Sequence, residues 1–178
     1  YKGVREEQWK IINEIGDPLN CRKKVYDFQK INLENSIELT PDICNGNKNC
    51  IKNAFINNDT VLLREGIYKV SSEGIFMEKK ILIGYPNEKI IIDSEKTYTA
   101  LMLNHSSVGN IIIQNSKNIG IHLGKNNLVY RTVVGNSGVF SSASQKGHGF
   151  SGTGPISNNN CIVSTESYNC LLYTSDAA

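Results

Sequence analysis

The residues best suited to chemistry lie between Thr97 and Thr165, a stretch without aspartate or glutamate that holds all three histidines. An imidazole accepts a proton near neutral pH, and lysine or arginine neutralises a carboxylate. Together these groups suit proton abstraction beside the carboxylate of a uronic acid, the step that begins β-elimination in an acidic polysaccharide. The candidate catalytic residues are His122, Arg131 and His148, and the candidate substrate-binding residues are Lys117, Lys125 and Lys146.

Each candidate also has a structural interpretation. Basic side chains at the corners of a repeat protein keep it soluble and keep its edges unpaired. His122 lies in a short apolar run, and a lone histidine on a strand is more often part of the scaffold. Residues 1–96 contain 15 acidic and 15 basic residues, whereas the following stretch is purely basic. That asymmetry favours a polyanion as partner.

Two other chemistries fit the sequence less well. A glycoside hydrolase needs two carboxylates that flank the scissile bond, and these would have to come from earlier residues or from outside this sequence. A calcium-assisted lyase needs clustered carboxylate oxygens, which the sequence does not offer, so no metal ligands are predicted. Glu78, Glu88 and Glu95 are interpreted as solvated partners of nearby lysines. The early acidic candidates are Glu73, Glu78, Glu88, Asp93 and Glu95.

A 21-residue period runs through the second half of the chain. Three short runs rich in Ile and Val repeat at this spacing, each bounded by Asn, Gly or Ser, which is typical of strands. Such a period indicates a solenoid, and the sequence therefore predicts an all-β parallel β-helix with equivalent residues about 4.8 Å apart. The equivalent apolar positions are Ile92, Ile113 and Val134, and two residues further on stand Ser94, Asn115 and Asn136.

The period is interrupted once. The next equivalent apolar position is Ser167, 33 residues on, with Asn169 in the asparagine position, and Cys161 superposes on Leu128. The additional residues lie mainly at 137–155, a Gly- and Ser-rich segment interpreted as a loop beside a binding groove, or else as a flexible linker. The asparagine column is interpreted as scaffold, because Asn tolerates turn conformations and stacked amides bond to one another.

A short helix is predicted at about 48–57, with Ile51, Ala54 and Phe55 on its apolar side, followed by a strand–turn–strand at 60–68. This segment resembles the entry of the pectate-lyase-like, right-handed parallel β-helix proteins, in which a capping helix runs into a DTV-x-L-x-x-G-x-Y strand. The run at 79–93 is similar to the second coil of that family. The matching entry residues are Asp59, Thr60, Val61, Leu63, Gly66 and Tyr68, with Asn58 in place of the usual glycine.

The resemblance implies an exported, carbohydrate-active protein, and it would allow calcium as a cofactor. We expect polysaccharide lyase-like activity on an acidic polysaccharide of the pectate or alginate type, in a monomer that is secreted or held at the cell surface. Two alternatives stay open: a non-catalytic β-helix adhesin or carbohydrate-binding surface protein, and a glycoside hydrolase whose carboxylates lie outside this sequence. No apolar run of about 18 residues predicts a membrane span. Because the basic residues are few and scarcely interleaved with aromatic ones, no nucleic-acid partner is expected.

Three regions are predicted along the chain. Residues 1–47 form a poorly defined N-terminal region with an amphipathic helix over 4–15, and its later part is either separate or an irregular first coil. Residues 48–169 form the capped solenoid. Residues 170–178 resemble a translated sequencing adapter, so the solenoid is expected to be truncated at its C-terminal side and the gene to continue past residue 169.

Four cysteines remain once Cys170 is assigned to this tail. Cys44 and Cys50 bracket the polar loop NGNKN and are predicted to form a small disulfide; metal binding is the weaker alternative, since no histidine is near. Cys161 is predicted to be a small buried hydrophobic residue. This cysteine usage favours an exported protein.

Overall fold

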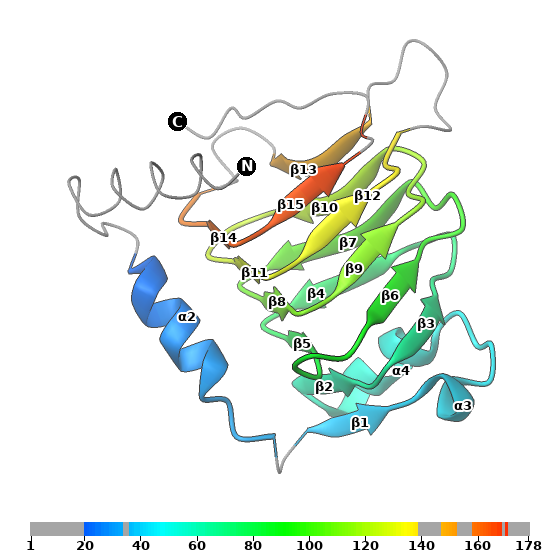
Figure 1. Cartoon of the computed structure of the whole chain (residues 1–178), viewed down its shortest axis with the longest axis horizontal. Coiled ribbons are helices and arrows are strands. Elements are labelled where there is room, and N and C mark those ends of the chain that lie inside the picture. Colours follow the sequence, from blue (N-terminus) through cyan, green and yellow to red (C-terminus); the bar gives the residue numbers. More distant parts are fainter. Residues whose placement is uncertain (1–19, 34–35, 139–146, 153–157, 169, 171–178) are drawn as a thin grey trace.

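The computed structural model describes residues 20–33, 36–138, 147–152, 158–168 and 170, and in them the chain is mostly β with few helices. Its strands form three sheets in which all paired strands run parallel. The chain passes from the first sheet to the second, on to the third and back to the first, so each coil adds one strand to each sheet (Figure 1). This architecture agrees with the predicted parallel β-helix.

Within each sheet the strands are stacked in the order of the chain. The first sheet contains β1 (Ile37–Leu39), β2 (Thr60–Leu63), β5 (Ile81–Gly84), β8 (Ser107–Gly109), β11 (Leu128–Tyr130) and β14 (Cys161–Val163). The second contains β3 (Gly66–Lys69), β6 (Ile90–Asp93), β9 (Ile112–Gln114), β12 (Val133–Gly135) and β15 (Glu166–Tyr168). The third contains β4 (Ile75–Glu78), β7 (Thr99–Asn104), β10 (Ile119–Leu123) and β13 (His148–Gly152). β1 precedes residue 48 and pairs with β2, so it extends the first sheet.

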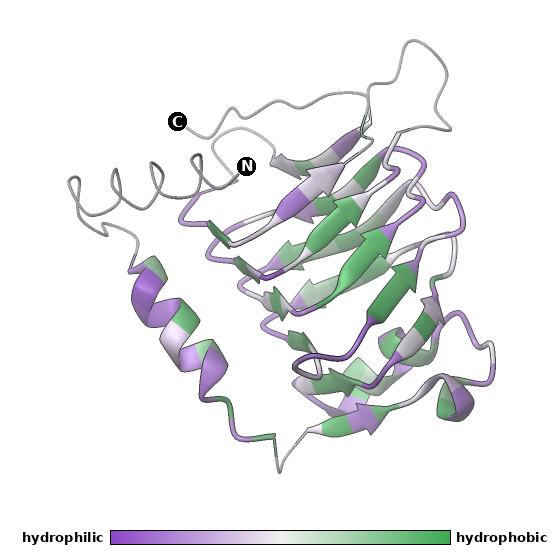
Figure 2. Ribbon diagram, viewed as in Figure 1, coloured by the Kyte–Doolittle hydropathy of each residue, from purple (hydrophilic) through white to green (hydrophobic). Residues whose placement is uncertain are grey.

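The 21-residue register is confirmed strand by strand in the second sheet. Ile92 of β6, Ile113 of β9 and Val134 of β12 are successive Cα partners, and all three are fully buried. The next partner of Val134 is Ser167 of β15, as predicted. Stacked branched side chains of this kind exclude water from the interior, and Figure 2 shows the hydrophobic colour continuing through β6, β9 and β12.

The asparagine column lies at the corners between the second and third sheets. Asn115 and Asn136 both adopt the left-handed conformation, with φ of 63° and 53°. Nδ2 of Asn136 donates to Oδ1 of Asn115 at 3.4 Å, and Nδ2 of Asn115 donates to Oδ2 of Asp93 at 3.1 Å. In the described coils the column is therefore scaffold, as predicted. Asn169 lies outside the described residues.

One helix lies in the segment predicted to be helical before the first full coil. α4 (Cys50–Asn57) buries Ile51, Ala54 and Phe55, the predicted apolar side, in the same core as the inward residues of the coils. α4 packs against β2 and β4. The predicted Cys44–Cys50 disulfide joins it to the preceding helix α3 (Pro41–Cys44). The helix predicted over 4–15 lies outside the described residues.

The outer face of the first sheet is covered by α2 (Cys21–Gln29), and a disulfide joins Cys21 to Cys161 of β14. Cys161 is buried and in register with Leu128, as predicted. Its predicted role as a plain hydrophobic residue is wrong, because α2 brings a second thiol to it across a sequence separation of 140. An outer apolar cluster between α2 and the first sheet is formed by Phe28 of α2 and by Leu62, Ile83, Leu128, Tyr130 and Cys161 of the sheet.

Candidate functional site

In the described part of the chain, the outer face of the third sheet is the open sheet face that carries histidine side chains. The face of the first sheet lies under α2. The face of the second sheet carries a row of aliphatic side chains, of which the first is 56% exposed. That aliphatic row consists of Ile67, Ile91, Ile112 and Val133, which are successive Cα partners.

The centre of the third face is a row that we call the histidine row. It consists of Phe76, Met102, His122 and Ser151, successive Cα partners on β4, β7, β10 and β13. Phe76 is 61% exposed and the other three are half-buried, whereas the strand neighbours of these residues are mostly buried in the core. Because neighbouring strands lie about 4.8 Å apart, the row presents one side chain per coil at a regular interval.

Beside the histidine row lies a network of hydrogen bonds. Glu78 and Asn104 are Cα partners, and Nδ2 of Asn104 donates to Oε2 of Glu78 at 2.6 Å. The backbone N–H of Lys125 donates to Oδ1 of Asn104 at 3.0 Å, which fixes the amide from the next coil. Nδ1 of His105 lies 3.4 Å from Oε1 of Glu78. Glu78 therefore pairs with a histidine and an amide, and the predicted lysine partner is not found among the described residues.

Four of the predicted site residues gather around the third sheet. His122 stands in the histidine row, and His148 is the first residue of β13, opposite Ile119. The two histidines are offset by three residues, about 10 Å along the strand direction. Lys117 and Lys125 are exposed and lie beyond the two ends of β10, the first two residues before it and the second two residues after it.

The remaining two predicted residues do not join this group. Arg131 follows β11, at the corner between the first and second sheets, and its guanidinium carbon lies 5.3 Å from the ring centroid of Tyr130. It is left-handed with φ of 46°, a conformation that costs energy for a long side chain. Lys146 lies outside the described residues. Part of the predicted loop at 137–155 is instead the regular strand β13, so His148 is a strand residue.

Several of the early acidic residues are held by cations. Glu95 accepts hydrogen bonds from Lys48 at 2.5 Å and Lys69 at 2.7 Å, and these bonds lower its pKa to about 2. Arg64 holds Glu88 through Nη2 at 2.6 Å and lowers the pKa of that carboxyl. The lysine partners predicted for Glu95 are thus confirmed, whereas Glu88 pairs with an arginine. In the described residues no three His, Cys, Asp or Glu side chains form a group that could hold a metal ion.

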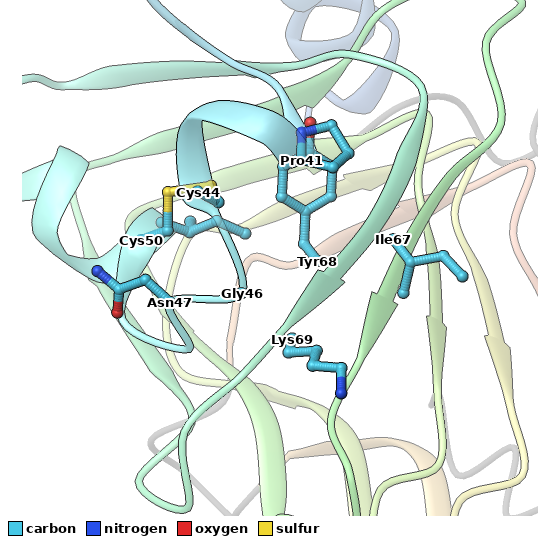
Figure 3. Close-up of a pocket in the computed structure, with 9 residues that line it drawn as sticks. Pro41, Cys44, Gly46, Asn47, Cys50, Ile67, Tyr68 and Lys69 are labelled. Carbon is cyan, nitrogen blue, oxygen red and sulfur yellow. A yellow bond between two sulfur atoms is a disulfide. The ribbon is translucent and has the colours of Figure 1, made fainter.

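Two hollows occur on other parts of the molecule. A cavity of about 270 Å³ lies beside the Cys44–Cys50 disulfide, with Pro41 and Tyr68 around it and Lys69 extending from β3 (Figure 3). An open hollow of about 360 Å³ is lined by Asp93, Glu95, Lys96 and Asn115. Neither hollow is lined by a histidine, so the candidate site is a face of the solenoid and not an enclosed pocket.

The sequence-based candidates omitted His105 as a functional residue and placed Glu78 among solvated ion pairs. The one sequence feature that points to these two residues is the acid-free stretch from Thr97 to Thr165, which includes His105 and follows Glu78. Phe76 and Met102 were omitted because nothing in the sequence places them in one row with His122. The pairing of β4, β7 and β10 supplies that information.

Comparisons with protein-family models, with curated proteins and with solved structures found no match. Among the helices in the described ranges, none has the length and apolar character needed to cross a membrane. Fold and site geometry are therefore the basis for assigning a function.

Proposed function

We propose that this chain is an exported, right-handed parallel β-helix protein of the pectate-lyase-like kind, which binds an acidic polysaccharide along the outer face of its third sheet and cleaves it by β-elimination. The histidine row carries this proposal. Sugar rings have apolar faces that pack on aromatic and thioether groups, such as those of the exposed Phe76 and the half-buried Met102. The strand spacing of about 4.8 Å is close to the length of one sugar residue in a polysaccharide.

The charges around the third face support an acidic ligand. Lys117 and Lys125 lie beyond the two ends of β10, one on each side of the histidine row, and so place positive charge along both margins of a chain bound on that row. Glu78, the acidic residue that the described strands place on this face, already has partners in His105 and Asn104, which reduces its repulsion of an anion. The face of the second sheet combines its aliphatic row with the carboxylates of Asp93 and Glu166, which oppose binding of an anion.

The entry segment supports the family-level part of the proposal. In the proposed arrangement α4 caps the first coil, with Ile51 and Phe55 as its buried plug. Gly66, a residue of the entry motif, has φ of 140°, and a Cβ there would lie 2.2 Å from Cγ of Pro41. The motif glycine therefore has a steric reason in this chain. Two disulfides support export to an oxidising compartment.

A second candidate function is binding without cleavage, as a carbohydrate-binding surface protein. The separation of Arg131 from the two histidines of the third sheet favours it, because that separation leaves the predicted catalytic group unassembled. The glycoside hydrolase alternative is the weaker one, since Glu73, Glu78, Glu88 and Glu95 are each engaged by a neighbouring side chain.

Binding of the full chain to polygalacturonate, with a neutral polysaccharide for comparison, tests the proposal. Phe76→Ala should weaken binding about tenfold, which corresponds to about 1.4 kcal/mol. Ile67→Ala is the matched control, because it removes an apolar side chain of similar exposure from the second sheet and should leave binding unchanged. Equal binding to both polymers would reject an acidic ligand, and equal losses in both variants would reject the third face as the site. Ultraviolet absorbance of the unsaturated product, with and without calcium, then separates cleavage from binding alone.

A further inference from the structure

His105 stands at a corner where the two following coils carry asparagine. It is left-handed with φ of 50°, at the corner between the third and first sheets. The equivalent residues of the two following coils, Asn126 and Asn159, are asparagines with φ of 55° and 58°. The equivalent residue of the preceding coil is Lys79, with φ of 54°, so the two coils that contain Glu78 and Asn104 carry titratable side chains at this corner.

The His105 ring faces a carboxylate that is itself held in place. Glu78 approaches Nδ1 of His105 with one oxygen and accepts from Asn104 with the other. Asn104 is fixed by the backbone N–H of Lys125, and the backbone N–H of His105 donates to the carbonyl of Lys125 at 2.7 Å. Three successive coils thus hold the pair. A carboxylate on Nδ1 orients an imidazole and leaves Nε2 to accept a proton from a ligand.

We infer that Glu78 and His105 form the proton-transfer pair of the third face, with Lys125 binding the carboxylate of the uronic acid that reacts. This inference rests on the proposed function and names the residues that would carry out its chemistry. His105 would be the catalytic base, and Glu78 a positioning residue.

The elimination balances without a further reactant. Nε2 of His105 takes the proton from the carbon beside the carboxylate, and the electrons of that C–H bond form a carbon–carbon double bond. The glycosidic C–O bond breaks, and the leaving oxygen takes the proton back from the imidazolium. Lys125 neutralises the carboxylate, on which negative charge develops as the proton leaves.

Charged residues stand next to His105 on the two adjacent coils. Glu78 is at the end of β4, Lys79 follows it at the equivalent corner of the preceding coil, and Lys125 stands on the next coil. His122 is in the neighbouring row of the same face. The neighbouring lysine positions supply positive charge for an anion on both adjacent coils, and the Glu78 carboxylate lies against the ring.

His105→Asn in the full chain tests the pair, because asparagine is the residue found at the two following corners. We expect formation of unsaturated product from polygalacturonate to fall about 100-fold or more, the usual contribution of a positioned base, with binding unchanged and thermal stability equal or higher. Glu78→Gln should lower kcat more than KM changes, since the ring loses the carboxylate that orients it. Glu73→Gln, which removes an exposed carboxylate paired with Lys52, is the control and should leave the rate unchanged.

The outcomes separate the inference from the proposed function. If the wild-type chain binds polygalacturonate but forms no unsaturated product, or if His105→Asn keeps the wild-type rate, the proton-transfer pair is rejected while binding stands. If the wild-type chain binds neither polygalacturonate nor alginate, both proposals are rejected together.

Discussion

Cys21 at the start of α2 is bonded to Cys161 at the start of β14, which ties a helix near the beginning of the described chain to its last strand on the first sheet. Near the other end of α2, Phe28 packs edge-on against Tyr130, with ring centroids 6.1 Å apart. The helix is thus held at two points over the outer apolar cluster. A face that would otherwise be open is closed by this attachment.

Removal of the Cys21–Cys161 disulfide should destabilise the fold strongly. Alanine at both positions should cost about 5 kcal/mol in the chain-entropy model, because the sequence separation of 140 leaves a long loop free in the unfolded chain. For Cys44 and Cys50, which are 6 apart, the same model gives about 2 kcal/mol. Urea unfolding followed by circular dichroism measures both. A larger loss for the short loop would contradict the anchoring role of α2.

Truncation in the buried column of the second sheet should be costly. Ile113 is fully buried between Ile92 and Val134, so Ile113→Ala should cost about 2–5 kcal/mol, through lost burial and the cavity left behind. Ile67→Ala removes the same type of side chain from the outer face of the same sheet and should stay within about 0.5 kcal/mol. Comparable losses in denaturant midpoint for the two variants would refute the inward and outward assignment.

The column around Ile113 was predictable because three consecutive coils keep one length. When the spacing is constant at 21 residues, an apolar residue that repeats must face the same interior, and the sequence alone then fixes which residues stack. Cys161 could be aligned with Leu128 across the longer coil because the runs NNLV and NNCIV match. Its disulfide could not be predicted, because nothing in a periodic pattern tells where a helix outside the repeat will lie.

The histidine row was hidden because the corners around the third sheet differ in length. From Phe76 to Met102 the separation is 26 residues, then 20 to His122 and 29 to Ser151. Side chains on the outer face also lack the hydrophobic signature that marks buried positions, so neither spacing nor composition brings these residues together. Strand pairing does so, and it likewise places Glu78 beside Asn104 and thus near His105.

Substitution at Asn115 should separate backbone conformation from hydrogen bonding. Asn115→Ala should cost about 2 kcal/mol, because alanine is strained at φ of 63° and the hydrogen bond from the side-chain amide to Asp93 is lost. Asn115→Gly keeps the left-handed conformation without strain and loses only the hydrogen bonding of the side-chain amide, so it should cost about 1 kcal/mol. Thermal unfolding compares the two. If glycine proved as destabilising as alanine, φ would not be the reason for asparagine in this column.

Glu95 should make the stability of the protein depend on pH in the acid range. Its pKa is about 2 in the folded chain, lowered first by the hydrogen bond from Lys48 and then by that from Lys69, against an ordinary value of 4.5. A lowered folded pKa means that the unfolded chain binds the proton more tightly. The stabilisation is therefore complete above pH 4.5 and is lost as the pH falls towards 2.

Glu95→Gln should accordingly flatten the dependence of urea midpoint on pH between 4.5 and 2, while lowering the midpoint at neutral pH. The double variant Lys48→Met and Lys69→Met removes both donors and should flatten the same range, which links the effect to this group of three charges. Because the Glu95 side chain is 30% exposed, 1 M salt should reduce the difference between wild type and variants. An unchanged slope in Glu95→Gln would show that another carboxylate governs acid unfolding.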